Sequence, residues 1–138
     1  MRPTLRVVVD TNVWMYAVGR PHTLQPEARQ FFADAVSRTA PTLCTSAEVL
    51  QELLHAYLPV ARTETLDAAL QLVKATEARC WPIEPEDVWH ARDLVPRHPT
   101  LGARDLLHLA CCRRRGVHKI RTFDQRLAAA FAASGDRH

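Results

Sequence analysis

Four acidic side chains occupy positions whose neighbours are mostly apolar. Asp10 comes directly after an apolar stretch and Asp124 after the last predicted strand, while Glu52 and Asp105 lie within or near the start of apolar helical segments. A carboxylate in such surroundings needs a partner, because burying an unpaired charge is costly. If the four converge, two like charges 4 Å apart repel by about 4 kcal/mol at an effective dielectric constant of about 20. Mg²⁺ or Mn²⁺, which prefer carboxylate and water oxygens, would relieve that repulsion.

A divalent cation held by carboxylates can lower the pKa of a bound water and clamp a scissile phosphate. Each acid also has a structural alternative when it is considered alone. Asp10 and Asp124 could each cap a following helix, and Asp105 could favour the positive end of its own helix. Glu52 could lie in water at the rim of an apolar stripe. Convergence of the four acids would favour a metal site over four separate structural roles. Spacing in the sequence alone does not prove that they converge.

The elements that would position these acids alternate between strand and helix patterns. The sequence predicts strands over 5–9, 41–45, 80–83 and 117–122, and helices over 12–18, 25–37, 45–58, 63–78, 85–91, 103–115 and 125–133. Thr45 and Glu48 have the spacing of a capping box at one helix start. The alternation predicts a three-layer α/β fold, with helices on both faces of a mostly parallel sheet of about four to five strands. In such sheets, sites form beyond the carboxyl ends of the strands, where Asp10 and Asp124 are expected.

Composition sets wider limits. A chain of 138 residues predicts one domain over 1–138. The net charge of +3 permits a nucleic-acid partner without requiring one. The longest apolar stretches are far shorter than the ~20 residues that span a bilayer, and the N-terminal residues show no secretory signal, so a cytoplasmic protein is expected. The four cysteines lack zinc-site spacing and are expected to be small buried residues.

The acids and their neighbours resemble the PIN-domain ribonucleases, and within them the VapC-type toxins of toxin–antitoxin pairs. The resemblance covers nearly the whole chain, and the four segments together, in this order, are more specific than any one of them. They are Val9-Asp10-Thr11-Asn12, Thr45-Ser46 leading to Glu52-Leu53-Leu54, Ala103-Arg104-Asp105-Leu106-Leu107-His108, and Ile120-Arg121-Thr122-Phe123-Asp124.

This resemblance implies a PIN-like fold in which Asp10, Glu52, Asp105 and Asp124 hold one or two Mg²⁺ or Mn²⁺ ions. Asn12 and Thr122 match polar residues that support the carboxylates. The implied reaction is hydrolysis of an RNA phosphodiester by a metal-activated water, which leaves a 5′-phosphate and a 3′-hydroxyl. The implied partners are an RNA substrate, a second copy of the chain in a homodimer, and an antitoxin that places a segment near the acidic cleft.

Several assignments have alternatives. Glu48 competes with Glu52, which we favour because it matches the family position. His108 could bind substrate or orient Asp105, and more often such a histidine is a packed residue with one hydrogen bond. Arg104 and the run Arg113-Arg114-Arg115 could contact RNA phosphates, although cations also favour a helix C-terminus. The remaining acids are expected on solvated helix faces and the tryptophans in the core or an interface; these are Asp34, Asp67, Asp87, Asp93, Trp14, Trp81 and Trp89.

Two other functions remain open. The first is a PIN-fold module that binds RNA or protein without cleavage, since Gln125 and Arg126 follow Asp124 where many relatives carry another acid or an Asn. The second is phosphotransfer with Asp10 as the nucleophile. That chemistry usually uses a second aspartate two residues later, where this chain has Asn12.

Overall fold

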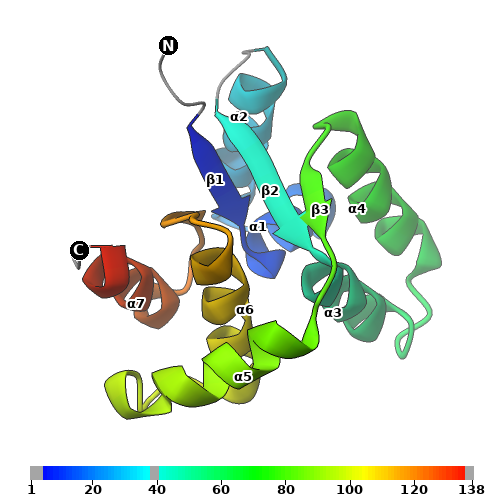
Figure 1. Cartoon of the computed structure of the whole chain (residues 1–138). Coiled ribbons are helices and arrows are strands. Elements are labelled where there is room, and N and C mark those ends of the chain that lie inside the picture. The colour runs from blue at the N-terminus through cyan, green and yellow to red at the C-terminus, as the bar shows by residue number, and fades with distance from the viewer. Residues whose placement is uncertain (1–4, 38–40, 136–138) are drawn as a thin grey trace.

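A four-stranded, all-parallel sheet lies between two layers of helices (Figure 1). The computed structural model describes residues 5–37 and 41–135. The strands lie side by side in the order β3-β2-β1-β4, with bounds β1 Arg6–Val9, β2 Thr42–Ser46, β3 Arg79–Trp81 and β4 Lys119–Arg121. The predicted three-layer α/β architecture is confirmed. The expected absence of a secretory signal falls partly on residues 1–4, which lie outside the described residues.

The central strand β1 is buried on both faces, as its continuous apolar sequence predicts. Val8 pairs with Cys44 of β2 on one side and with Ile120 of β4 on the other. Val8 and Val9 are both fully buried, and they belong to two different cores. Side chains alternate across a strand, so consecutive residues of β1 serve the two faces of the sheet.

Seven α-helices cover the sheet within the described residues. One core packs α1 Thr11–Val18, α2 Gln25–Ser37, α3 Ala47–Tyr57 and α4 Thr63–Ala75, and the other packs α5 Pro85–Leu94, α6 Ala103–Arg114 and α7 Gln125–Gly135. A short 3₁₀-helix, Val95–Arg97, follows α5. No described helix is both long enough and apolar enough to cross a membrane.

The start of α3 differs from the predicted capping box. The strand continues to Ser46, whose hydroxyl accepts a hydrogen bond from the N–H of Val49 at 3.3 Å and so caps the helix. Thr45 is instead a fully buried strand residue, whose hydroxyl has no hydrogen-bond partner among the described residues. The capping box of Thr45 and Glu48 was therefore wrong by one residue, and Glu48 has no capping role.

Two other expectations are wrong, and a third is narrowed. Asp87 does not lie on a solvated helix face, because its side chain is 0% exposed. Cys80 is exposed, unlike the other three cysteines, because it lies on the edge strand β3. Trp89 is 67% exposed on α5, which excludes the core and leaves the interface alternative as a prediction, whereas Trp14 and Trp81 are buried.

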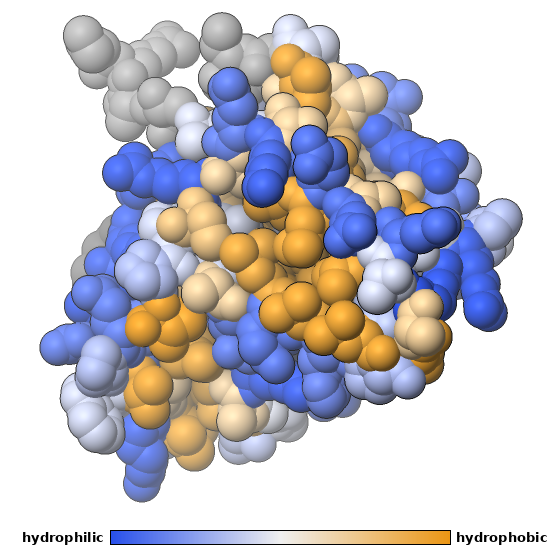
Figure 2. Space-filling view, turned by 90° about the vertical axis from the view of Figure 1, so that its right-hand side faces the viewer, coloured by the Kyte–Doolittle hydropathy of each residue, from blue (hydrophilic) through white to orange (hydrophobic). Residues whose placement is uncertain are grey.

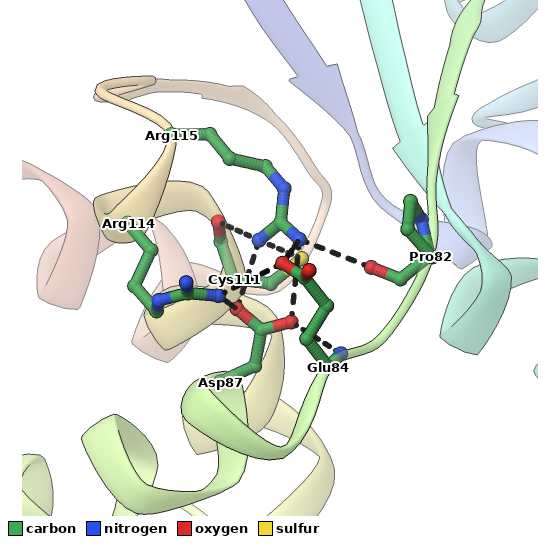
Figure 3. A network of polar contacts seen from close by, with 6 residues as sticks. All are labelled: Pro82, Glu84, Asp87, Cys111, Arg114 and Arg115. Atoms are coloured by element: carbon green, nitrogen blue, oxygen red, sulfur yellow. Dashed lines mark hydrogen bonds and ion pairs between the residues drawn. The ribbon is translucent and has the colours of Figure 1, made fainter.

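Asp87 is buried at the centre of an ion-pair network that joins the start of α5 to the end of α6 (Figure 3). Its carboxylate accepts hydrogen bonds from Arg114 at 2.7 Å and Arg115 at 2.8 Å, and from the backbone N–H of Glu84 at 2.8 Å. Burial alone would raise the pKa of Asp87, but the hydrogen bonds from Arg115 and Glu84 outweigh it and hold the pKa below its ordinary value. The network is thus a structural connection between two helices.

Candidate acidic site

The ends of the adjacent strands β1 and β4 bring Asp10 and Asp124 to one edge of the sheet. The N–H of Asp10 donates to the carbonyl of Arg121 at 3.0 Å, which extends the pairing of the two strands. The hydroxyl of Thr122 then donates to Asp10 Oδ2 at 2.7 Å and accepts from the N–H of Asp124 at 3.0 Å. One hydroxyl therefore connects the two sequence-predicted acids.

Asn12 completes this connection from the first turn of α1. Its amide Nδ2 donates to Thr122 Oγ1 at 3.3 Å, and its Oδ1 accepts from the N–H of Phe123 at 3.3 Å. The Thr122 hydroxyl thus donates once and accepts twice, which uses its full hydrogen-bonding capacity. Thr122 contacts Asp10 directly and Asn12 contacts Thr122, so both residues lie where they can support the Asp10 carboxylate.

Both aspartates also cap helices, as their structural alternatives predicted. Asp10 is the N-cap of α1, and its Oδ1 accepts from the N–H of Thr11 at 2.8 Å. Asp124 Oδ1 accepts from the N–H groups of Arg126 and Leu127 at 2.9 and 3.2 Å at the start of α7. Each aspartate therefore uses one carboxylate oxygen to satisfy backbone N–H groups at the start of a helix.

Glu52 approaches the same edge from α3. Its Oε2 accepts a hydrogen bond from the Thr11 hydroxyl at 3.0 Å. Burial raises the pKa of Glu52, the bond from Thr11 partly opposes this, and repulsion from Asp10 adds to it. Glu48 contributes a weaker repulsion from the same helix. Glu52 rather than Glu48 is therefore the α3 carboxylate that hydrogen-bonds next to Asp10.

Asp105 reaches the cluster from the first turn of α6. Burial raises the pKa of its carboxyl, and repulsion from Asp10 and then Asp124 raises it further, while Arg126 opposes the shift. Asp10 is thus close enough to repel both Glu52 and Asp105, and Asp124 is close enough to repel Asp105. Within residues 5–37 and 41–135, however, no three carboxylate, imidazole or thiol groups are grouped closely enough to hold one ion by themselves. The arrangement fits Mg²⁺, which usually keeps several waters and binds through one or two carboxylates, better than a cation that needs a closed cage of protein ligands.

Cationic residues differ in how far they are engaged elsewhere. Arg104 is exposed next to Asp105, and its charge favours ionised Glu52. In contrast, Arg114 and Arg115 bind Glu84 and Asp87. Arg113 donates to the Phe131 carbonyl at 2.8 Å. These contacts favour a role of residues 113–115 in stabilising the fold over a role in binding RNA phosphates. Arg104 is therefore the better candidate for phosphate contact.

His108 lies one turn after Asp105 and is 4% exposed. Neither ring nitrogen has a hydrogen-bond partner among the described residues, and the ring packs 6.1 Å from that of Phe131. Burial lowers the pKa of His108, with a weaker opposing effect from Asp10. His108 is therefore a packed residue, but without the single hydrogen bond that was expected.

Thr11 is the site residue that the sequence reasoning missed. Its hydroxyl is the only described group that donates a hydrogen bond to Glu52. The available signal was its position between Asp10 and Asn12 at the end of a strand, where a hydroxyl reaches a neighbouring element. A threonine at a helix start has many other uses, so this signal is weak by itself.

Comparisons with known proteins agree with this architecture. Residues 7–132 match the family model of the PIN domain. The chain is 59% identical over 125 residues to Ribonuclease VapC23 of Mycobacterium tuberculosis, covering 91% of this chain and 98% of that protein. It is 37% identical over 119 residues to Ribonuclease VapC13 of the same species, covering 86% and 90%. The crystal structure of M. tuberculosis VapC20, a sarcin-ricin loop cleaving toxin, matches the fold with a TM-score of 0.75 at 21% identity, covering 90% of this chain and 94% of that chain.

Proposed function

Because the chain belongs to the PIN-domain family and, within it, to the VapC ribonucleases, we propose that it is an endoribonuclease and the toxin of a toxin–antitoxin pair. The observation that carries the proposal is the convergence of Asp10, Glu52, Asp105 and Asp124 from four elements at the carboxyl edge of the sheet. Its substrate is RNA, so the expected place of action is the cytoplasm.

The four carboxylates are the residues that would hold one or two Mg²⁺ or Mn²⁺ ions, together with water. A bound divalent cation would supply a water of lowered pKa and stabilise negative charge on the attacking and leaving oxygens of the phosphodiester. Burial is the main reason that the pKa values of Glu52 and Asp105 are raised, and repulsion from Asp10 raises both further. This smaller, repulsive part supports the donor set, because a bound cation would relieve it.

The surrounding residues of the chain position these carboxylates. Thr122 and Asn12 orient Asp10, and Thr11 orients Glu52. Arg104 is placed to contact a phosphate of the substrate and to oppose the repulsion between the RNA backbone and the acidic cluster. These hydrogen bonds exist before substrate arrives, so little reorganisation is needed during the reaction.

Cleavage of total cellular RNA by the purified chain tests the proposal. With Mg²⁺ or Mn²⁺ we expect discrete fragments with 5′-phosphate ends, and we expect them to disappear in EDTA. Asp105→Asn should lower the rate by at least about 100-fold while circular dichroism shows an intact fold. Asp34→Asn, which changes an exposed acid on α2, is the matched control and should cleave at the wild-type rate. An Asp105→Asn protein that cleaves like wild type would remove Asp105 from the site.

The alternative is a PIN-fold module that binds RNA without cleavage. The observation that favours it is that no three of the described ligand groups form a closed metal site. Calorimetry with Mg²⁺ separates the two functions. RNA binding that persists with no measurable Mg²⁺ binding and no cleavage would support the module.

An apolar groove of about 630 Å³ between α1, α2 and α4 offers a surface for the antitoxin. Its lining includes Ala17, Phe32, Ala33, Ala68 and Leu72. Figure 2 views the molecule from the side of α4 and shows apolar surface gathered between charged side chains on this face. We assign the groove to an apolar segment of the antitoxin. Ala68→Glu should weaken inhibition by the antitoxin and leave RNA cleavage unchanged.

We also propose that the chain forms a homodimer through exposed apolar side chains of α3 and α5. Leu54 and Leu58 are exposed on and after α3, and Val88 and Trp89 on α5. Figure 1 shows both helices at the same end of the molecule. Exposed apolar surface of this kind marks interaction sites more often than isolated apolar side chains do.

A further inference from the structure

A second cavity, of about 320 Å³, opens directly beside the acidic site. It lies against α1, the turn that follows it, and the end of α3. Its lining combines rings, cations and one amide that belongs to the acidic site; the six residues that matter below are Asn12, Tyr16, Arg20, His22, Tyr57 and Arg62. A cavity of this size is at the lower end of the range of ligand pockets and accommodates one planar ring system.

Asn12 joins this cavity to the acidic site. The same side chain lines the cavity and hydrogen-bonds to Thr122, whose hydroxyl binds Asp10. A second connection comes from Tyr16, whose ring packs edge-on against that of Phe123 at 5.4 Å, next to Asp124 in the sequence. If one group of a polymer binds in the cavity, the backbone of that polymer can therefore pass close to the carboxylates of the acidic site.

The cavity presents aromatic faces in fixed positions. The rings of Tyr16 and His22 lie 4.5 Å apart at an interplanar angle of 37°. The exposed His22 ring is held in place, because its Nδ1 accepts a hydrogen bond from the N–H of Leu24 at 3.0 Å. This bond makes Nδ1 an acceptor and leaves Nε2 as the donor of the neutral ring. An ordered, accessible ring of this kind can stack on a base.

Two arginines at the cavity have no carboxylate partner. Within the described part of the chain, neither Arg20 nor Arg62 forms an ion pair, unlike Arg114 and Arg115. Arg62 is held over the Tyr57 ring at 5.6 Å and donates to Thr65 Oγ1 at 3.1 Å. Two unpaired cations close to an acidic cluster are suited to an anionic ligand that must approach that cluster.

We propose that this pocket binds one base of single-stranded RNA beside the scissile phosphate, with Arg20 and Arg62 contacting the adjoining phosphates. This inference rests on the proposed function, and it adds the residues that would hold an unpaired base of the RNA and its adjoining phosphates. Unpaired bases are recognised by stacking on aromatic side chains, and arginines position the backbone through its phosphates. A fully paired duplex keeps its bases stacked and cannot supply one to the pocket.

The test measures binding of short, fluorescein-labelled single-stranded oligoribonucleotides in EDTA, where hydrolysis is not required. His22→Ala should weaken binding by about 5- to 150-fold, the range for loss of one base–aromatic stack. His22→Phe keeps a ring, loses the same bond to Leu24, and should bind much closer to wild type. Arg62→Ala should weaken binding and lower the salt dependence by about one phosphate contact. Lys74→Ala, about 18 Å further along α4, is the matched control for loss of a cation.

Cleavage assays with Mg²⁺ separate this inference from the proposed function. His22→Ala should raise KM and change kcat by less than about threefold, because the ring holds substrate and does not contact the reacting atoms. If wild type does not cleave RNA but His22→Ala still weakens binding, the pocket stands and the ribonuclease proposal fails. If wild type cleaves RNA and all the pocket variants bind like wild type, the pocket assignment fails alone. Variants that bind RNA normally but escape the antitoxin would overturn it by assigning the pocket to a protein partner.

Discussion

The hydroxyl of Thr122 donates a hydrogen bond to Asp10 Oδ2 at 2.7 Å, although the two residues are 112 positions apart in the chain. The same oxygen accepts from the N–H of Asp124 and from Asn12. The orientation of the first carboxylate therefore depends on a residue that is not itself an acid. It also depends on β1 and β4 ending side by side, as the sheet order requires.

Replacing this hydroxyl should lower activity without removing a carboxylate. Thr122→Val keeps the shape of the side chain and removes the bond to Asp10. We expect kcat to fall by about 10- to 100-fold, as is typical when the hydrogen-bond partner of a metal ligand is lost. Thr122→Ser should restore kcat to within about threefold of wild type. Mg²⁺ titration by calorimetry provides a second measurement, because loss of stability alone would not weaken ion binding in the folded protein.

The two glutamates of α3 should differ sharply. Glu52 binds Thr11 and lies close to Asp10, whereas Glu48 affects the site only through weaker repulsion. We expect Glu52→Gln to lower RNA cleavage by at least about 100-fold and Glu48→Gln to change it by less than about threefold. The pair is matched, since both variants remove one charge from the same face of one helix. If both variants lost cleavage activity equally, Glu48 would contribute to the site as much as Glu52, which would contradict the choice of Glu52 alone.

The positions of the acids at the sheet edge were predictable because parallel strands end at a common edge. Strand order was not needed for that conclusion, so Asp10 and Asp124 could be placed from local patterns alone. The partners of Asp87 could not, because Arg114 and Arg115 follow it by 27 and 28 residues and reach it only through helix packing. Helical spacing on α5 could show that Asp87 lies near polar neighbours, but not that another helix covers it.

The pocket beside the acids also lay beyond sequence reasoning. Tyr16 and His22 are separated by a turn after α1, and only the return of the chain at that turn places their rings together. For Trp89, the apolar pattern on α5 predicted either the core or an interface and could not distinguish them. The structure leaves the side chain exposed, and only a partner could bury it.

Mg²⁺ should stabilise the protein more at pH 8 than at pH 5. The folded-state pKa values of Glu52 and Asp105 are raised, so the stability associated with their protonated forms is present at low pH and is lost as the pH rises through those values. Above that range the ionised cluster repels itself, and a bound cation relieves the repulsion. At about 100 times the dissociation constant, Mg²⁺ should add about 2.7 kcal/mol, or roughly 5–10 °C in Tm.

Thermal unfolding with and without Mg²⁺ at the two pH values provides the measurement. Asp105→Asn should unfold at a higher temperature than wild type at pH 8 without Mg²⁺, and it should show a smaller Mg²⁺-induced increase. The control is Asp67→Asn, which changes an exposed acid on α4. An equal Mg²⁺-induced increase in Asp105→Asn and wild type would exclude Asp105 from the cation site.

The exposed Trp89 should be central to self-association. Tryptophan is prominent among residues that dominate interface energies, and loss of such a residue weakens binding by about 30-fold or more. We therefore expect Trp89→Asp to shift the chain from dimer to monomer in light scattering after size-exclusion chromatography. Val36→Asp, at a side chain 60% exposed on α2, is the control and should remain dimeric. A wild-type chain that is monomeric at all concentrations would contradict the proposed dimer.

Asp87 should make the protein sensitive to acid. Its folded-state pKa is lowered, so the stability it contributes is present above its ordinary value of 3.8 and is lost as the pH falls through the folded-state value. Asp87→Asn should unfold more easily at pH 7, by about 2–3 kcal/mol. That is less than the ~3–5 kcal/mol of a fully buried pair, because Arg114 and Arg115 are 30% and 15% exposed.

The same variant should show a flatter loss of stability below pH 4 than wild type, measured by urea unfolding over a pH series. Glu86→Gln, an exposed acid one position earlier on α5, should keep the wild-type profile. An Asp87→Asn profile parallel to that of wild type would show that other carboxylates dominate acid unfolding. Because the network lies on α5 and α6 away from the site edge, cleavage by the folded Asp87→Asn protein should stay within about threefold of wild type at pH 7, which separates a structural ion pair from a catalytic one.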